Sequence, residues 1–168
     1  MKIDITLVDN SPLSEMSKTA VLSYINSLKS ISFENHTLLN EIDSIAIDLV
    51  FVSDQQIKEI NAAYRNTDKA TDVITFSYWA NLAENEPQFQ GPDAEVYISI
   101  DTACRQSKRH GISLEEELAL LIVHGVLHAT GLDHENSTDE AKKMRMKEAD
   151  ILSQMGIKGV SPLTVTAN

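Results

Sequence analysis

Hydrophobic residues alternate with polar ones at the start of the chain, where single polar residues separate Ile3, Ile5 and Leu7. This two-residue period predicts a half-buried β-strand, and residues 44–52, which are rich in β-branched side chains, predict a second one. Residues 13–31, between these strands, carry hydrophobic side chains at roughly helical spacing. They predict an amphipathic helix that joins the two strands.

The middle of the chain continues this mixture of helices and strands. Ser53 and Gln56 have the spacing of a capping box, which predicts that a helix begins there. Short hydrophobic segments predict strands at residues 73–76 and 96–100. Residues 77–95, between these strands, are long for a connection in a compact domain, and we interpret them as a loop that faces substrate or moves.

The carboxyl-terminal half has clearer helix signals. Ser113 and Glu116 form a second capping-box pattern before a hydrophobic run, and Gly131 can end a helix in a left-handed turn. Together they predict a helix over residues 114–130. Its hydrophobic run is interrupted by histidines and a glycine and is too short to cross a membrane, so we interpret it as a buried helix.

A last amphipathic helix is predicted after Ser137, which with Glu140 repeats the capping pattern, and it ends near Gly156. Strands and helices are therefore mixed along the chain without regular alternation. This order favours an α+β fold, with a small mixed β-sheet of about four strands flanked by helices, over a doubly wound parallel sheet.

Composition agrees with one compact domain. The chain has 168 residues, of which 42% are hydrophobic, so we assign residues 1–168 to a single globular domain. Its first residues contain no hydrophobic signal-peptide core, and its single cysteine, Cys104, cannot form an intrachain disulfide. We therefore expect a cytoplasmic protein without a membrane segment.

The charge balance argues against a general nucleic-acid binder. A net charge of −11 repels phosphate backbones when the protein is taken as a whole. Basic residues are nevertheless concentrated in the middle of the chain, which is compatible with a local basic face. They are Lys58, Arg65, Lys69, Arg105, Lys108 and Arg109.

Three of the five histidines lie in one short segment, and their spacing predicts a metal site. His124 and His128 are four residues apart on the predicted helix, so their side chains are neighbours on one face. Gly131 lets the chain turn after the helix, which can bring His134 to the same point as a third ligand.

Three imidazole nitrogens suit one zinc ion per chain, although nickel, copper and manganese also bind such ligands. They leave a fourth coordination position open, which is typical of a catalytic zinc site. We therefore predict a hydrolytic metal centre. His36 and His110 have no comparable neighbours in the sequence, and we interpret them as structural or surface residues.

The histidine spacing is also that of the metzincin proteases, but the glutamate that follows their first histidine is Gly125 here. That glutamate is the general base of zinc proteases, so its loss weakens a peptidase interpretation. A peptidase would need a base from elsewhere, such as Glu135. The glycine could leave room for substrate beside the metal or allow close helix packing, and the sequence leaves both open.

Two segments resemble the YbeY-type endoribonucleases, a family of metal-dependent proteins implicated in ribosomal RNA maturation. The first runs from Asn61 to Phe76 with the pattern N-x-x-Y-R-x-x-D-x-x-T-D-V, and the second, residues 124–134, reads H-G-x-x-H-x-x-G-x-D-H. The likeness spans most of the chain. Residues 74–77 and 94–95 depart from the usual family pattern, so the role of the loop between them stays open.

The resemblance implies a single-strand-directed endoribonuclease with zinc on the three histidines, acting in 16S ribosomal RNA 3′-end maturation and ribosome quality control. It also implies that Arg65 faces the metal cleft and acts on phosphate. A guanidinium suits this task because it can bind two phosphate oxygens at once. The implied partners are single-stranded or ribosomal RNA and the ribosome or its associated proteins.

Two other functions stay open at this point: a metallopeptidase of metzincin-like spacing, and a non-catalytic, metal-stabilised factor that associates with the ribosome. For a nuclease, the sequence does not say whether water or the RNA 2′-hydroxyl attacks. Asp72 and Asp133 are candidates to orient histidine ligands, or they are turn residues. The oligomeric state is not determined by these patterns.

Overall fold

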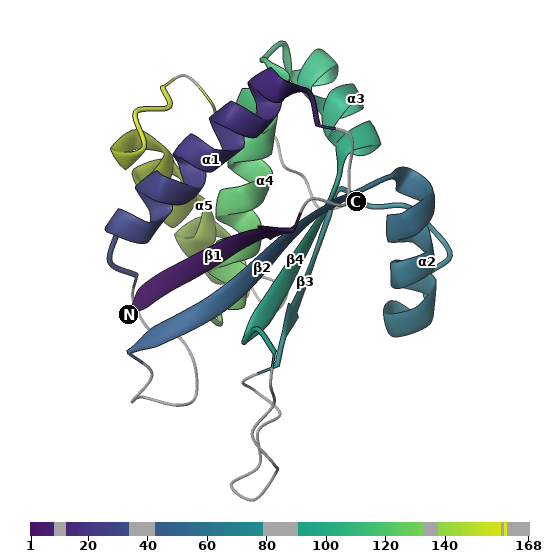
Figure 1. Ribbon diagram of the computed structural model, residues 1–168, viewed down its shortest axis with the longest axis horizontal. Helices are drawn as coiled ribbons and strands as arrows, with labels where there is room; N and C mark the ends of the chain where they lie inside the picture. Colours follow the sequence, from purple (N-terminus) through teal and green to yellow (C-terminus); the bar gives the residue numbers. More distant parts are fainter. Residues whose placement is uncertain (9–12, 34–42, 79–90, 133–137, 159, 161–168) are drawn as a thin grey trace, which may run out of the picture.

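The computed structural model describes residues 1–8, 13–33, 43–78, 91–132, 138–158 and 160 (Figure 1). Within these residues the chain forms four strands and five helices in mixed order. The strands are β1 (Lys2–Val8), β2 (Ser44–Val52), β3 (Val73–Ser77) and β4 (Ala94–Ser99). The helices are α1 (Glu15–Ser30), α2 (Asp54–Arg65), α3 (Ile100–His110), α4 (Leu114–Ala129) and α5 (Thr138–Gln154).

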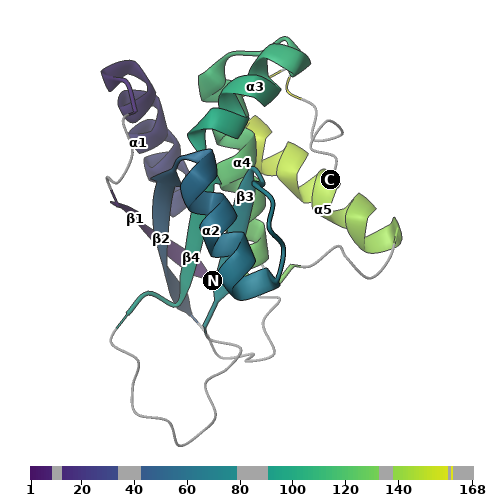
Figure 2. The same ribbon diagram turned by 90° about the vertical axis from the view of Figure 1, so that its right-hand side faces the viewer.

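The strands form one mixed sheet in the order β1-β2-β4-β3. β1, β2 and β4 are parallel, and β3 pairs antiparallel with β4 at the edge of the sheet. Figures 1 and 2 show α1, α4 and α5 on one side of the sheet and α2 on the other, while α3 continues directly from β4. The predicted α+β fold with a small mixed sheet is confirmed.

Helix α4 is the central element of the core. Its side chains are buried around most of its circumference, because it packs against the sheet, α1, α3 and α5. The capping box of Ser113 and Glu116 is present, and Gly131 has a φ of +88°, as the predicted left-handed turn requires. The interpretation as a buried helix is confirmed. Neither α4 nor any other helix in the described residues is long and apolar enough to cross a membrane.

Local signals predict most element boundaries correctly. β2 covers residues 44–52, and Ser53 and Gln56 cap α2 reciprocally. Gly156 has a φ of +79° just beyond the end of α5, whereas the predicted cap of that helix, Ser137, lies outside the described residues. Residues 79–90, which form most of the long connection between β3 and β4, also lie outside the described residues.

Helix α3 is not predicted by the sequence pattern, and the strand predicted at residues 96–100 ends one residue early. Ser99 is the N-cap of α3, and its hydroxyl accepts a hydrogen bond from the Thr102 backbone N–H at 3.2 Å. The buried residues of α3 are Ala103, Gln106 and Ser107. The helix therefore lacks the large hydrophobic side chains from which a helical period is recognised.

Candidate metal centre and basic pocket

His124 and His128 lie one turn apart on α4, and their rings converge. Their Nε2 atoms are 3.2 Å apart, and the ring centroids are 4.6 Å apart. Two nitrogens bound to one tetrahedral zinc at about 2.0–2.1 Å would lie about 3.3 Å from each other. The pair therefore fits two ligands of one zinc ion.

The third predicted ligand, His134, lies outside the described residues, as do Asp133 and Glu135. In the part of the chain that the structure describes, no group of three histidine, cysteine or acidic side chains could hold a metal ion. The complete three-histidine site thus stays a prediction, and the structure describes two of its three predicted ligands, both on α4.

Glu148 on α5 orients the His124 ring. Its Oε1 lies 2.6 Å from Nδ1 of His124, and Nδ1 is the donor because a carboxylate only accepts. With the proton held on Nδ1, the lone pair of Nε2 points toward His128. The sequence motifs do not identify Glu148, although a signal exists. It lies on the buried face of α5 with Met144 and Ile151, where an unpaired carboxylate would be costly.

Replacing Glu148 with glutamine is expected to weaken zinc binding by about 10–100-fold. Glutamine keeps the size of the side chain but replaces the charged acceptor with a neutral one, which weakens the hydrogen bond that orients the His124 ring. Zinc affinity is measured by competition with a chromophoric chelator. Asp150→Asn, which changes an exposed carboxylate on the same helix, is the control. Equal zinc affinities for the two variants would show that Glu148 does not position the ligand.

Gly125 lies where α4 packs against β3 and β4. A Cβ atom added there would be 2.4 Å from Cγ1 of Val96 and 3.4 Å from Oγ1 of Thr75. The Thr75 hydroxyl also donates to the Gly125 carbonyl at 3.3 Å. The glycine therefore permits close helix–sheet packing, and it does not leave room for substrate. The glutamate of a metzincin has no space at this position.

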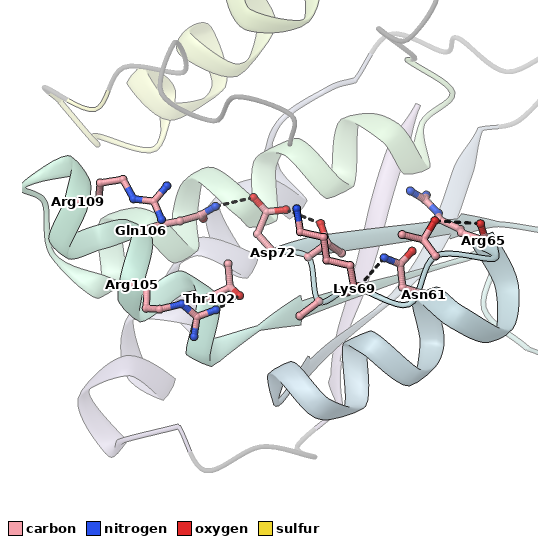
Figure 3. Close-up of a pocket in the computed structure, with 11 residues that line it drawn as sticks. Asn61, Arg65, Lys69, Asp72, Thr102, Arg105, Gln106 and Arg109 are labelled. Carbon is pink, nitrogen blue, oxygen red and sulfur yellow. Dashed lines mark hydrogen bonds between the residues drawn. The ribbon is translucent and has the colours of Figure 1, made fainter.

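A basic pocket lies beside the segment that connects α2 to β3 (Figure 3). Its volume is about 360 Å³, and four of its side chains are cations from three parts of the chain. Arg65 ends α2, Lys69 lies in the connecting segment, and Arg105 and Arg109 belong to α3. On a chain with a net charge of −11, this grouping creates a local anion-binding surface.

Hydrogen bonds hold the segment between α2 and β3 in place, where it lines this pocket. The buried Asn61 donates from Nδ2 to the Lys69 carbonyl at 2.7 Å. Asp72 accepts from the next backbone N–H at 2.8 Å and from Nε2 of Gln106 at 2.9 Å. Asp72 is therefore a turn residue that links the segment to α3. The alternative role considered for it, the orientation of a histidine ligand, stays a prediction, while Glu148 contacts the ring of His124.

The four cations differ in their partners. Nη2 of Arg105 is 2.7 Å from Oδ2 of Asp54. Burial would raise the pKa of Asp54, but hydrogen bonds from two hydroxyls and from Arg105, together with its positive charge, lower the pKa overall. Arg65, Lys69 and Arg109 form no ion pair within the described residues. Their charges are therefore available to a bound anion.

Strand β3 connects the pocket to the histidines. Asp72 lines the pocket immediately before β3, and Thr75 in that strand bonds to Gly125, the neighbour of His124. The described lining of the pocket includes neither His124 nor its partner on α4. That Arg65 faces the metal cleft therefore stays a prediction, which the short path along β3 supports.

Comparison with known proteins points to one family. Residues 7–156 match a family model described as endoribonuclease YbeY. The chain is 41% identical over 120 residues to endoribonuclease YbeY of Staphylococcus carnosus, covering 68% of this chain and 75% of the relative. It is 32% identical over 163 residues to endoribonuclease YbeY of Thermodesulfovibrio yellowstonii, covering 92% and 99%. A solution structure of a Thermotoga maritima protein is similar with a TM-score of 0.50 and 25% identity, covering 91% and 88%.

Proposed function

The chain belongs to the endoribonuclease YbeY family, and from this premise we propose that it is a zinc-dependent enzyme that cleaves single-stranded RNA. The proposed role is maturation of ribosomal RNA, at the 3′ end of 16S RNA, together with ribosome quality control. The proposal of an RNA substrate rests mainly on the basic pocket around Arg65, which concentrates positive charge on an acidic protein. A phosphodiester chain matches this charge, whereas peptide hydrolysis does not require it.

We place the metal on His124, His128 and His134. Support comes from the 3.2 Å separation of the two described Nε2 atoms and from the hydrogen bond between Glu148 and His124. Both features suit imidazoles that bind zinc. When bound, zinc would supply Lewis-acid chemistry that stabilises negative charge on the phosphodiester.

In this proposal Arg65 binds the scissile phosphate. Its planar guanidinium offers two parallel N–H donors to the non-bridging oxygens, and these contacts strengthen as the oxygens gain charge in the transition state. The chain turns sharply after Arg65 at Asn66, which has a φ of +56°. The Asn61 side chain then ties the returning segment to α2, so the backbone around Arg65 is ordered before RNA binds.

Replacing Arg65 with alanine is expected to lower kcat/KM for single-stranded RNA by about 10²–10³-fold, with unchanged zinc content. The variant loses a donor aimed at developing negative charge but no metal ligand. Cleavage by zinc-loaded and chelated protein is measured together with metal content. Lys58→Ala is the matched control, because Lys58 lies on the same helix, contacts Asp68 at 3.4 Å and does not line the pocket. Parent-like cleavage by Arg65→Ala, or chelator-sensitive peptidase activity without nuclease activity, would overturn the proposal.

The ends of the cleaved RNA identify the attacking group. Attack by the neighbouring 2′-hydroxyl forms a 2′,3′-cyclic phosphate and releases a 5′-hydroxyl, whereas direct attack by water forms no cyclic product. Mass spectrometry of the products distinguishes the two routes.

We also propose that the ribosome or a ribosome-associated protein supplies part of the binding energy, which places the enzyme in the cytoplasm. The net charge of −11 repels RNA outside the basic pocket. Affinity for naked RNA should therefore be weak and should fall steeply with salt concentration.

A further inference from the structure

The basic pocket extends well beyond Arg65. Figure 3 shows Arg65 and Arg109 at opposite ends of the labelled side chains, with Lys69, Asp72 and Gln106 between them. Arg65 is the last residue of α2, whereas Arg109 lies in the last turn of α3. A phosphate that contacts Arg65 therefore leaves Arg109 without an anionic partner.

Arg109 is available to an external anion. It is exposed, and its side chain forms no ion pair or hydrogen bond with the residues that the structure describes. Its charge does act on the buried Glu117, but Glu117 already contacts Nδ1 of His110 at 2.8 Å. Burial also raises the pKa of Glu117, which disfavours the charged form that would neutralise Arg109.

Neighbouring cations complete an anion-binding wall. Lys69 is exposed, and Arg105 is held by Asp54 one turn before Arg109. Residues four apart on a helix have Cβ atoms about 5–6 Å apart, so Arg105 and Arg109 lie on one face of α3, where the charge of Arg105 is paired with Asp54 and that of Arg109 is not. The single carboxylate in the described lining, Asp72, is occupied by hydrogen bonds from neighbouring amides.

Gln106 adds a buried acceptor to this wall. Its Nε2 donates to Asp72, but its Oε1 is buried without a hydrogen-bond partner among the described residues. The Gln106 side chain therefore holds Asp72 in place, and the anion-binding charges of this end of the pocket come from Arg109 and Lys69.

We propose that the α3 end of the pocket, formed by Arg109 with Lys69, binds a phosphate of the RNA strand that lies outside the cleaved bond. This inference rests on the proposed function, which places Arg65 at the scissile phosphate. It makes the enzyme selective for single strands long enough to extend from Arg65 to α3. Because such a remote contact is equal in the ground state and the transition state, it lowers KM without changing kcat.

The test compares Arg109→Ala with Lys108→Ala on two substrates. Lys108 is exposed on the same helix and carries the same charge, but it does not line the pocket. The substrates are a ribodinucleotide and a single-stranded RNA long enough to cross the whole pocket. For the long RNA, Arg109→Ala should raise KM about tenfold at unchanged kcat. Its kcat/KM for the dinucleotide should equal that of the parent, and Lys108→Ala should resemble the parent on both substrates.

Equilibrium binding separates this inference from the proposed function. Fluorescence anisotropy of labelled single-stranded RNA measures the affinity of the chelated protein for RNA in the absence of cleavage. Arg109→Ala should weaken binding about tenfold and lower the slope of log affinity against log salt concentration by about 0.7, the value for one phosphate contact on a single strand.

Each outcome decides between the two claims. If zinc-loaded parent protein cleaves no RNA but Arg109→Ala still weakens RNA binding, the proposed function fails and the phosphate site stands. The inference is wrong if Arg109→Ala and Lys108→Ala bind the long RNA equally. It is also wrong if Arg109→Ala impairs the dinucleotide as much as the long strand, because Arg109 would then act at the scissile phosphate.

Discussion

Replacing His128 with alanine is expected to remove zinc from the protein at neutral pH and to lower RNA cleavage at least about a thousandfold. The Nε2 atoms of His128 and His124 converge to 3.2 Å, so the variant loses one of the two nitrogens that face the same point on α4. The predicted ligands that remain, His124 and His134, would hold zinc more weakly than three imidazoles. In the proposed mechanism, the reaction would then lose the charge stabilisation that zinc would supply.

Zinc content by plasma mass spectrometry and cleavage of single-stranded RNA measure these two losses. His110→Gln is the matched control, since it removes an imidazole outside the metal centre and keeps a donor for Glu117. That control should retain zinc and activity. A His128→Ala variant with the zinc content and cleavage rate of the parent would show that the metal centre is assigned wrongly.

The effect of His128→Ala is expected to be functional, with the fold retained. Buried hydrophobic residues from the sheet, α1, α4 and α5 form a continuous core that does not depend on the metal. His124 and His128 are only partly buried. Circular dichroism of His128→Ala and of chelated parent should therefore match that of the zinc-loaded parent. Unfolding of both samples would instead show that the metal holds the fold together.

Replacing Gly125 with alanine is expected to lower the free energy of unfolding by about 2 kcal/mol. Alanine favours a helix by about 1 kcal/mol over glycine, so an exposed position would show the opposite sign. Here the new Cβ would lie 2.4 Å from Cγ1 of Val96, which is fully buried in β4. Either α4 or the sheet must move, and that cost exceeds the gain in helix propensity.

Denaturant unfolding of Gly125→Ala, Val96→Ala and the double variant tests this packing. Val96→Ala alone loses buried methyl groups and should destabilise the protein, but it also removes the atom that the new Cβ would meet. The double variant should therefore be more stable than the sum of the two single effects predicts. If Gly125→Ala were more stable than the parent, close packing would not explain the glycine.

Strands and capped helices could be predicted because their signals are local. The hydroxyls of Ser53 and Ser113 each accept a hydrogen bond from the backbone N–H three residues ahead. A pattern of four residues is therefore enough to predict where α2 and α4 begin. Helix α3 could not be predicted in this way. Its buried residues are small or polar, and they are covered only because α3 packs against α4 and α2.

In the candidate metal centre, too, some features follow from local spacing and others depend on tertiary packing. His124 and His128 are neighbours by the geometry of any helix, and their pairing follows from their spacing. Glu148 reaches His124 from 24 positions away, because α5 packs against α4. The reason for Gly125 is equally non-local, since the atoms that exclude a side chain there belong to β3 and β4.

By itself, the sequence determined the fold class, the histidine pair and the resemblance to a nuclease family, since each depends on residues at short spacings along the chain. Only the tertiary structure decided that Arg65 and Arg109 share one pocket and that Gly125 serves packing. No spacing rule relates side chains on α2 and α3. Their distance depends on where the hydrophobic core places the two helices, and only the folded chain brings those charges together.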